Sequence, residues 1–155
     1  MSKVKTTLKR FSYLRDYKVL ENVTVNEHHF DYIMVGVFGI LSVCFFDKKG
    51  ELYGNESDEN FILVDTKKNR EKAENLIKKA KKDVEVLRAL ISKEKIYNLK
   101  IDSAIVVDDK KCQTFFTSPD LPLVKLSALS KFLNQEKFDL DNKVDADKIV
   151  SLLTK

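Results

Sequence analysis

The run from Tyr32 to Phe46 is the longest apolar stretch of the chain, and it limits the folds that this sequence can adopt. It holds about 15 residues, whereas a helix that crosses a bilayer needs about 20. Gly36 and Gly39 interrupt the run, and strand-forming residues lie on both sides of them. The pattern therefore predicts a hairpin of two buried strands, over residues 30–35 and 40–46, rather than a membrane helix.

Periodic patterns on either side of this hairpin predict the rest of the N-terminal half. Apolar residues at spacings of three and four indicate a short amphipathic helix over residues 3–15. Residues 17–25 alternate in the manner of a strand, and residues 61–65 form another short strand pattern. Between the hairpin and this last strand, ELYG at 51–54 and the acidic NESDEN at 55–60 indicate a turn or loop.

The C-terminal half begins with a change of period in a lysine-rich segment, residues 67–95. Its apolar residues recur every three or four positions, which predicts a long helix with lysines on the opposite face. A compact apolar strand is expected over residues 101–107, another strand over 113–117, and helices over 126–133 and 145–153. The order helix–strand–strand–strand–helix–strand favours an α/β or α+β domain with a mixed central sheet flanked by helices.

Chain length and composition favour a single domain. The 155 residues and 17.9 kDa fit a core over residues 10–135 and a C-terminal helical extension over 136–155. Hydrophobic residues make up 43% and charged residues 34%, which excludes a disordered or disulfide-rich chain. Cys44 and Cys112 both fall in apolar strand patterns, and the first residues lack the apolar segment of a secretion signal. We therefore expect reduced, buried thiols and a cytoplasmic protein.

Several of these segments resemble the nuclease-related domain (NERD) family of the PD-(D/E)xK, or restriction-endonuclease-like, superfamily. The resemblance rests on YKVLENVTV (17–25), FDYIMVG (30–36), GILSV (39–43) and GELYG (50–54), together with the αβββαβ order of elements. Members of that family place an Asp on one strand and an E-x-K motif on the next. The resemblance implies a fold in which the Asp and the Glu bind Mg²⁺ and the Lys positions the attacking water.

At the motif positions, this sequence keeps one of the three functional residues. Asp31 matches the metal-binding Asp, but Cys44 stands in the position of the Glu and Phe46 in the position of the Lys. Side chains two apart in a strand share a face, so a thiol and a phenyl ring occupy the face that would carry the chemistry. Family members often have a further Glu in the first helix, and no acidic residue precedes Asp16 here.

The resemblance therefore implies a catalytically degenerate site, in which Asp31 is a vestigial catalytic residue, and a protein that is no longer an enzyme. We expect a binding or interaction module with no cofactor, whose partner is DNA or RNA, held weakly, or another protein. The first alternative is an active Mg²⁺-dependent nuclease with relocated ligands near Asp31, such as Asp47 if a bulge turns its side chain. The second is a protein–protein scaffold that contacts no nucleic acid. No membrane partner is expected, and the oligomeric state stays open.

Positive charge gathers in residues 67–95, which makes this segment the candidate contact for nucleic acid. It holds 11 Lys or Arg against 5 Asp or Glu, although the whole chain carries a net charge of only +4. Binding to a phosphate backbone is largely electrostatic. A solvated helix face is the alternative, because acidic residues interleave and no aromatic residue alternates with the lysines as a stacking platform requires. The candidate residues are Lys72, Lys78, Lys79, Lys81, Lys82 and Arg88.

The chain has two histidines, His28 and His29. Glu27, His29 and Asp31 alternate along a predicted strand and could face Cys44, and such a set of side chains can bind zinc. The histidines follow a turn-like Asn-Glu pair, however, and no C-x-x-C or H-x-x-x-H spacing is present. An exposed pair of histidines is the preferred interpretation, and no metal site is expected.

Overall fold

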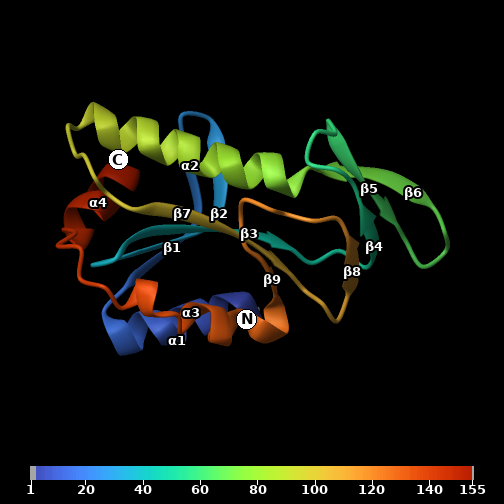
Figure 1. Cartoon of the computed structure of the whole chain (residues 1–155), viewed down its shortest axis with the longest axis horizontal. Coiled ribbons are helices and arrows are strands. Elements are labelled where there is room, and N and C mark those ends of the chain that lie inside the picture. The colour runs from blue at the N-terminus through green and yellow to red at the C-terminus, as the bar shows by residue number, and fades with distance from the viewer. Residues whose placement is uncertain (1–2, 155) are drawn as a thin grey trace.

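The computed structural model describes residues 3–154, which form a layered core with a second, smaller sheet attached (Figure 1). The core is a five-stranded sheet covered by α2 and α4 on one face and by α1 and α3 on the other. The expected α/β architecture with a mixed central sheet is confirmed. The helices and strands are α1 (Lys3–Arg15), β1 (Lys18–Val25), β2 (His28–Gly36), β3 (Gly39–Phe46), β4 (Gly50–Tyr53), β5 (Asn60–Val64), β6 (Arg70–Glu74), α2 (Leu76–Lys93), β7 (Ile101–Val107), β8 (Cys112–Phe115), β9 (Leu123–Lys125), α3 (Leu129–Leu133) and α4 (Ala146–Leu153).

The five-stranded sheet has the order β1-β2-β3-β7-β9. Its first three strands pair in antiparallel fashion, β7 pairs in parallel with β3, and β9 pairs in parallel with β7. A parallel neighbour requires a crossover connection, and α2 provides it on one face of the sheet before β7 begins. The result is the expected αβββαβ order around one mixed sheet.

The predicted glycine turn joins β2 to β3 through Val37 and Phe38. Gly39 has a φ of +133°, a conformation that side-chain-bearing residues rarely adopt. A Cβ at Gly39 would lie 2.2 Å from the carbonyl oxygen of Lys100, so the close approach of this backbone also requires glycine. The turn thus fixes the register in which β3 meets both β2 and β7.

A four-stranded sheet, ordered β6-β5-β4-β8, corrects two expectations. The ELYG segment, expected in a turn or loop, lies largely in strand β4, and residues 70–74, expected in the long helix, form strand β6. The sequence of β6, REKAE, has a single apolar residue, Ala73, which fits a strand period as well as a helix period. Ala73 pairs with Phe61 of β5 and is buried. The helix α2 begins only at Leu76, because Asn75 caps it through its side-chain oxygen.

Three apolar clusters hold these layers together. One packs α1 and α3 against the five-stranded sheet, and another packs the second half of α2 and α4 against its opposite face. The remaining cluster joins the first half of α2 to both sheets, and it contains Cys44 and Phe46. Val4, Leu8 and Phe11 of α1 are buried, whereas Leu14 in its last turn is exposed.

The C-terminal helix α4 packs against β1 and β2, with Ile149 and Leu153 buried. Asp145 caps it by accepting a hydrogen bond from the backbone N–H of Lys148. In the part of the chain from residue 3 to residue 154, no helix is both long and apolar enough to cross a membrane.

Candidate functional site

Strand β3 places Cys44 and Phe46 on the face that lies beneath α2, as their spacing predicts. Cys44 is fully buried and Phe46 is 8% exposed. Both side chains pack in the cluster that the first half of α2 and the second sheet complete. The first half of α2 and the second sheet therefore cover the two positions at which the resemblance implies a Glu and a Lys. Their neighbours include Leu52, Phe61, Leu76, Ile77 and Ala80.

Asp31 contacts the backbone of β3 rather than a side chain on that face. The backbone pairing of β2 with β3 ends at Tyr32, the residue after Asp31. Just beyond this end, the carboxylate of Asp31 accepts a hydrogen bond from the backbone N–H of Phe45 at 2.9 Å, in place of a main-chain carbonyl. Its other oxygen lies 3.6 Å from Nδ1 of His29. The hydrogen bond gives Asp31 a structural function, and its descent from a metal ligand stays a prediction.

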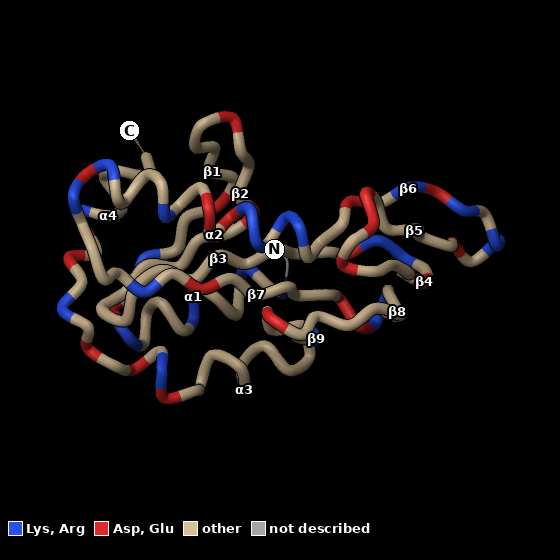
Figure 2. The backbone as a smooth tube through the Cα atoms, turned by 45° about the horizontal axis from the view of Figure 1, so that its top comes forward, with Lys and Arg blue, Asp and Glu red and all other residues tan. Residues whose placement is uncertain are grey.

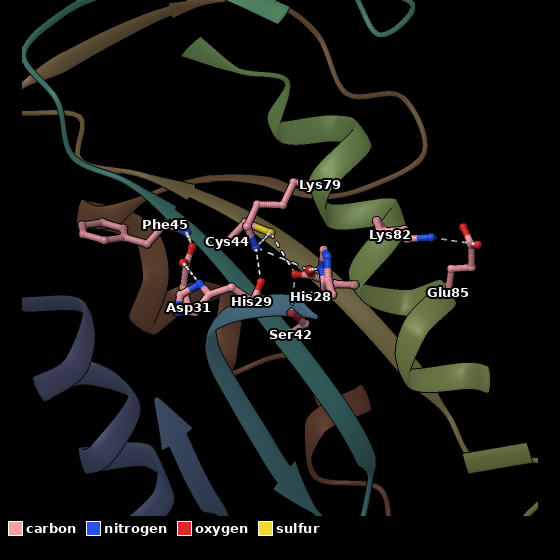
Figure 3. A network of polar contacts seen from close by, with 10 residues as sticks. His28, His29, Asp31, Ser42, Cys44, Phe45, Lys79, Lys82 and Glu85 are labelled. Carbon is pink, nitrogen blue, oxygen red and sulfur yellow. Dashed lines mark hydrogen bonds and ion pairs between the residues drawn. The ribbon is translucent and has the colours of Figure 1, made fainter. Parts of the chain in front are cut away.

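A second carboxylate, Asp83 of α2, reaches the position beside Cys44. It is fully buried, and its Oδ2 accepts the hydroxyl of Ser42 at 2.7 Å and the thiol of Cys44 at 3.1 Å. Its Oδ1 contacts Nε2 of His28 and lies 3.4 Å from Nζ of Lys79. Four donors thus share the two oxygens, which satisfies a carboxylate that would otherwise be costly to bury. Figure 3 shows the donor side chains converging beneath α2: His28, Ser42, Cys44 and Lys79.

Lys79 supplies the positive charge of this cluster. Its side chain is 9% exposed, and its Nζ also donates to the carbonyl oxygen of His29 at 3.1 Å. Burial alone would lower the pKa of Lys79, but the negative charges of Asp83 and Asp31 outweigh it and raise the pKa. The ammonium is therefore held charged against the Asp83 carboxylate, and the two form a buried ion pair.

Cys44 acts in this cluster as a neutral donor. Burial raises the pKa of its thiol well above the ordinary value, and the neighbouring Asp83 carboxylate raises it further. A thiol of this kind stays protonated and is a poor nucleophile. The S–H group can therefore donate to Asp83, and a catalytic thiolate at this position is disfavoured.

The arrangement does not suit Mg²⁺ chemistry. Mg²⁺ prefers oxygen ligands in near-octahedral geometry, whereas the motif positions offer a protonated thiol and a phenyl ring. The Asp83 oxygens face protein donors and have no exposed surface that could meet a phosphodiester. Asp47, the relocated ligand considered above, is exposed in the loop after β3. Within residues 3–154, no three or more His, Cys, Asp or Glu side chains group so as to hold a metal ion.

Of the two histidines, which were expected to be an exposed pair, only His29 is exposed. The His28 ring is 17% exposed and is paired with Asp83, so the expectation is wrong for this residue. His29 is 52% exposed, in agreement with it. Glu27 lies in the turn before β2 with a φ of +67°, and so does not continue the strand face. The zinc set of Glu27, His29, Asp31 and Cys44 does not form.

Sequence reasoning missed Asp83, His28 and Ser42 as partners. Asp83 belongs to the buried face of α2, between Ala80 and Leu87, where a carboxylate interrupts an apolar stripe. That interruption, together with Lys79 four residues earlier, is a signal that the sequence contains. The identity of the other partners could not be inferred, because Ser42 lies 41 residues away from Asp83 and His28 lies 55 away.

The six basic candidates for nucleic-acid contact are dispersed. Lys79 forms the buried ion pair with Asp83, and Lys72 lies on β6 instead of on the helix. Lys81 pairs with Glu56 and lies 3.3 Å from Asp120, while Lys82 lies 3.4 Å from Glu85. The remaining two donate to backbone carbonyls, Lys78 at 3.4 Å and Arg88 at 2.7 Å. A nucleic-acid contact through this set stays a prediction.

A family model described as the nuclease-related domain matches residues 2–107, which span both motif strands and α2. No curated protein and no solved structure matches the chain.

Proposed function

Since the chain belongs to the nuclease-related domain family, we propose that it is a catalytically degenerate member that acts as a binding or interaction module. The observation that carries this proposal is the burial of Cys44 and Phe46 at the E-x-K positions. A nuclease needs these positions to open toward metal, water and phosphate. Here they lie beneath α2 and the second sheet, in an apolar cluster.

The polar groups near these positions support the same proposal. Asp83 and Lys79 bring a carboxylate and an ammonium close to Cys44, as an active site would require. The ammonium and the carboxylate pair with each other, and Asp83 also contacts His28 and Ser42, all inside the fold. We infer that this cluster stabilises the contact between α2 and β3, and that the domain contributes binding rather than hydrolysis.

A cleavage assay tests this proposal. The purified domain is incubated with supercoiled plasmid and with labelled single strands in Mg²⁺ or Mn²⁺, beside Asp31→Ala and Glu85→Ala. We expect no metal-dependent cleavage by any of the three proteins. Cleavage that is lost in Asp31→Ala and kept in Glu85→Ala, an exposed carboxylate on α2, would instead support the active nuclease with relocated ligands.

A further inference from the structure

The five-stranded sheet ends at β9, a strand of three residues whose neighbour in the sheet is β7. Figure 2 shows β9 on the side of this sheet that is nearer to β8. The backbone N–H of Ile105 donates to the carbonyl oxygen of Pro122 at 2.9 Å, so the main-chain groups at Pro122 point toward β7. Main-chain groups alternate in direction along a strand. The N–H and C=O of Leu123 and the N–H of Lys125 therefore point the opposite way, out of the sheet.

These outward groups are free to bind another chain. Within residues 3–154, no hydrogen bond engages the backbone N–H or C=O of Leu123, or the backbone N–H of Lys125. The preceding outward carbonyl, that of Leu121, already accepts the hydroxyl of Ser118 at 2.7 Å, so the open stretch begins at Leu123. A sheet edge with unpaired main-chain donors and acceptors is a template for a further strand.

A hollow lies on each face of β9. On the face toward α3, a hollow of about 460 Å³ is lined by apolar side chains that include Val124, Ala128 and Phe132. On the opposite face, a hollow of about 400 Å³ reaches to β8 and is lined in part by the polar residues Gln113 and Thr114. Successive side chains of an added strand point to alternate faces. Such a strand would direct its side chains toward the two hollows in turn.

The hollow beside α3 favours an acidic partner. Lys125 and Lys131 line it, and among the described residues no carboxylate does. Both lysines are exposed, and neither forms an ion pair within residues 3–154. The hollow on the opposite face is lined by one lysine, Lys125, and one carboxylate, Asp109, so its charge favours neither sign.

We propose that β9 binds an extended peptide of a partner protein, which adds to the sheet as a further strand beyond β9. Main-chain hydrogen bonds to Leu123 and Lys125 hold the peptide, and an apolar side chain of the peptide enters the hollow beside α3. Acidic residues two positions before and after that side chain lie on the same face and pair with Lys125 and Lys131. The inference rests on the binding role proposed above and assigns it a class of partner and a surface.

Fluorescence anisotropy with labelled heptapeptides tests this inference. The peptides have four acidic residues, two at each end, around a Thr-apolar-Thr centre in which the apolar residue is Val, Leu or Phe. We expect at least one of them to bind with a Kd below about 1 mM, and its form with Lys in place of the acids to bind at least about tenfold more weakly. Two N-methylated forms each block one alternating set of amides. Only the form that blocks the amides facing β9 should lose binding.

Variants at position 125 separate the backbone from the charge. The φ of Lys125 is −70°, a value that proline also adopts, so Lys125→Pro removes an outward donor without breaking a hydrogen bond of the described fold. We expect Lys125→Pro to weaken binding of the acidic peptide about fivefold more than Lys125→Ala, which loses only the charge. Thermal melting of each variant verifies that it is folded.

Charge reversal at Lys131 tests the acidic preference. Lys131→Glu should weaken binding of the acidic peptide about fivefold and strengthen binding of the lysine form. The matched control Lys93→Glu reverses an exposed lysine in the last turn of α2 and should change neither affinity.

Several results would overturn the inference. They are no binding of any acidic peptide at about 1 mM, equal binding of the lysine form, equal loss in Lys125→Pro and Lys125→Ala, or an effect of Lys93→Glu. Sedimentation of the protein alone covers a second copy of the chain as the occupant. Self-association that Lys125→Pro abolishes would assign the edge to a dimer and overturn the inference as well. None of these outcomes alters the result of the cleavage assay, which tests the degenerate site separately.

Discussion

Replacing Asp83 by Ala should lower the free energy of unfolding by about 3–5 kcal/mol, because it leaves the buried charge of Lys79 without its partner. The same change removes the acceptor for His28, Ser42 and Cys44, all of which lie in the interior or close to it. Equilibrium unfolding in urea, followed by circular dichroism, measures the change. Asp83→Asn keeps an acceptor but loses the charge, and should fall between Asp83→Ala and the wild type.

The control for this prediction is Glu85→Ala, on the same helix and in the same lysine-rich segment. Glu85 is 73% exposed and pairs only loosely with Lys82, so its removal should change stability by no more than about 0.5 kcal/mol. Replacing both members of the buried pair, Asp83→Leu with Lys79→Met, should recover part of the loss, since no unpaired charge remains. A double variant as unstable as the sum of its single changes would contradict the assignment of an ion pair.

Restoring the family motif should destabilise the protein instead of reviving a nuclease. Cys44→Glu places a second carboxylate where the Cys44 sulfur now lies 3.1 Å from Asp83, and Phe46→Lys places an ammonium in an apolar cluster. Buried charges without full compensation cost several kcal/mol each. We therefore expect each variant to lose several kcal/mol of stability in urea unfolding, and the double variant to show no metal-dependent cleavage.

Size-matched substitutions separate this effect from a general sensitivity of the two positions. Cys44→Ser keeps a donor for Asp83, and Phe46→Met keeps apolar bulk, so each should cost less than about 1.5 kcal/mol. A stable double variant with Glu and Lys at the motif positions would show that the space beneath α2 accepts the catalytic side chains. The burial argument for a degenerate site would then be wrong.

The core of the fold follows from the sequence because its signals are local and repeated. The glycine turn at residues 36–39 and the apolar strands beside it predict the β2–β3 hairpin, and the run 101–107 coincides with β7. The second sheet could not be predicted in full. Its strands are short, and β6 offers one apolar residue, so only pairing with β5 reveals it as a strand.

For the candidate site, the sequence predicts only which residues occupy the motif positions. The resemblance to the family indicates which functional residues those positions would otherwise hold. It does not show that α2 buries Cys44 and Phe46, or that Asp83 and Lys79 come to lie beside them. Likewise, Tyr53 and Phe115 are 62 positions apart in the chain, and only the parallel pairing of β4 with β8 stacks their rings.

Manganese binding tests the central claim most directly, because a trace of contaminating nuclease cannot imitate a stoichiometric metal site. Mn²⁺ is titrated into the wild type, Asp31→Ala and Glu85→Ala, with binding followed by calorimetry and by the electron paramagnetic resonance signal of the free ion. A site closed by Cys44, Phe46 and the buried pair predicts no saturable binding in any of the three proteins. One Mn²⁺ per chain, present in the wild type and in Glu85→Ala but absent from Asp31→Ala, would contradict it.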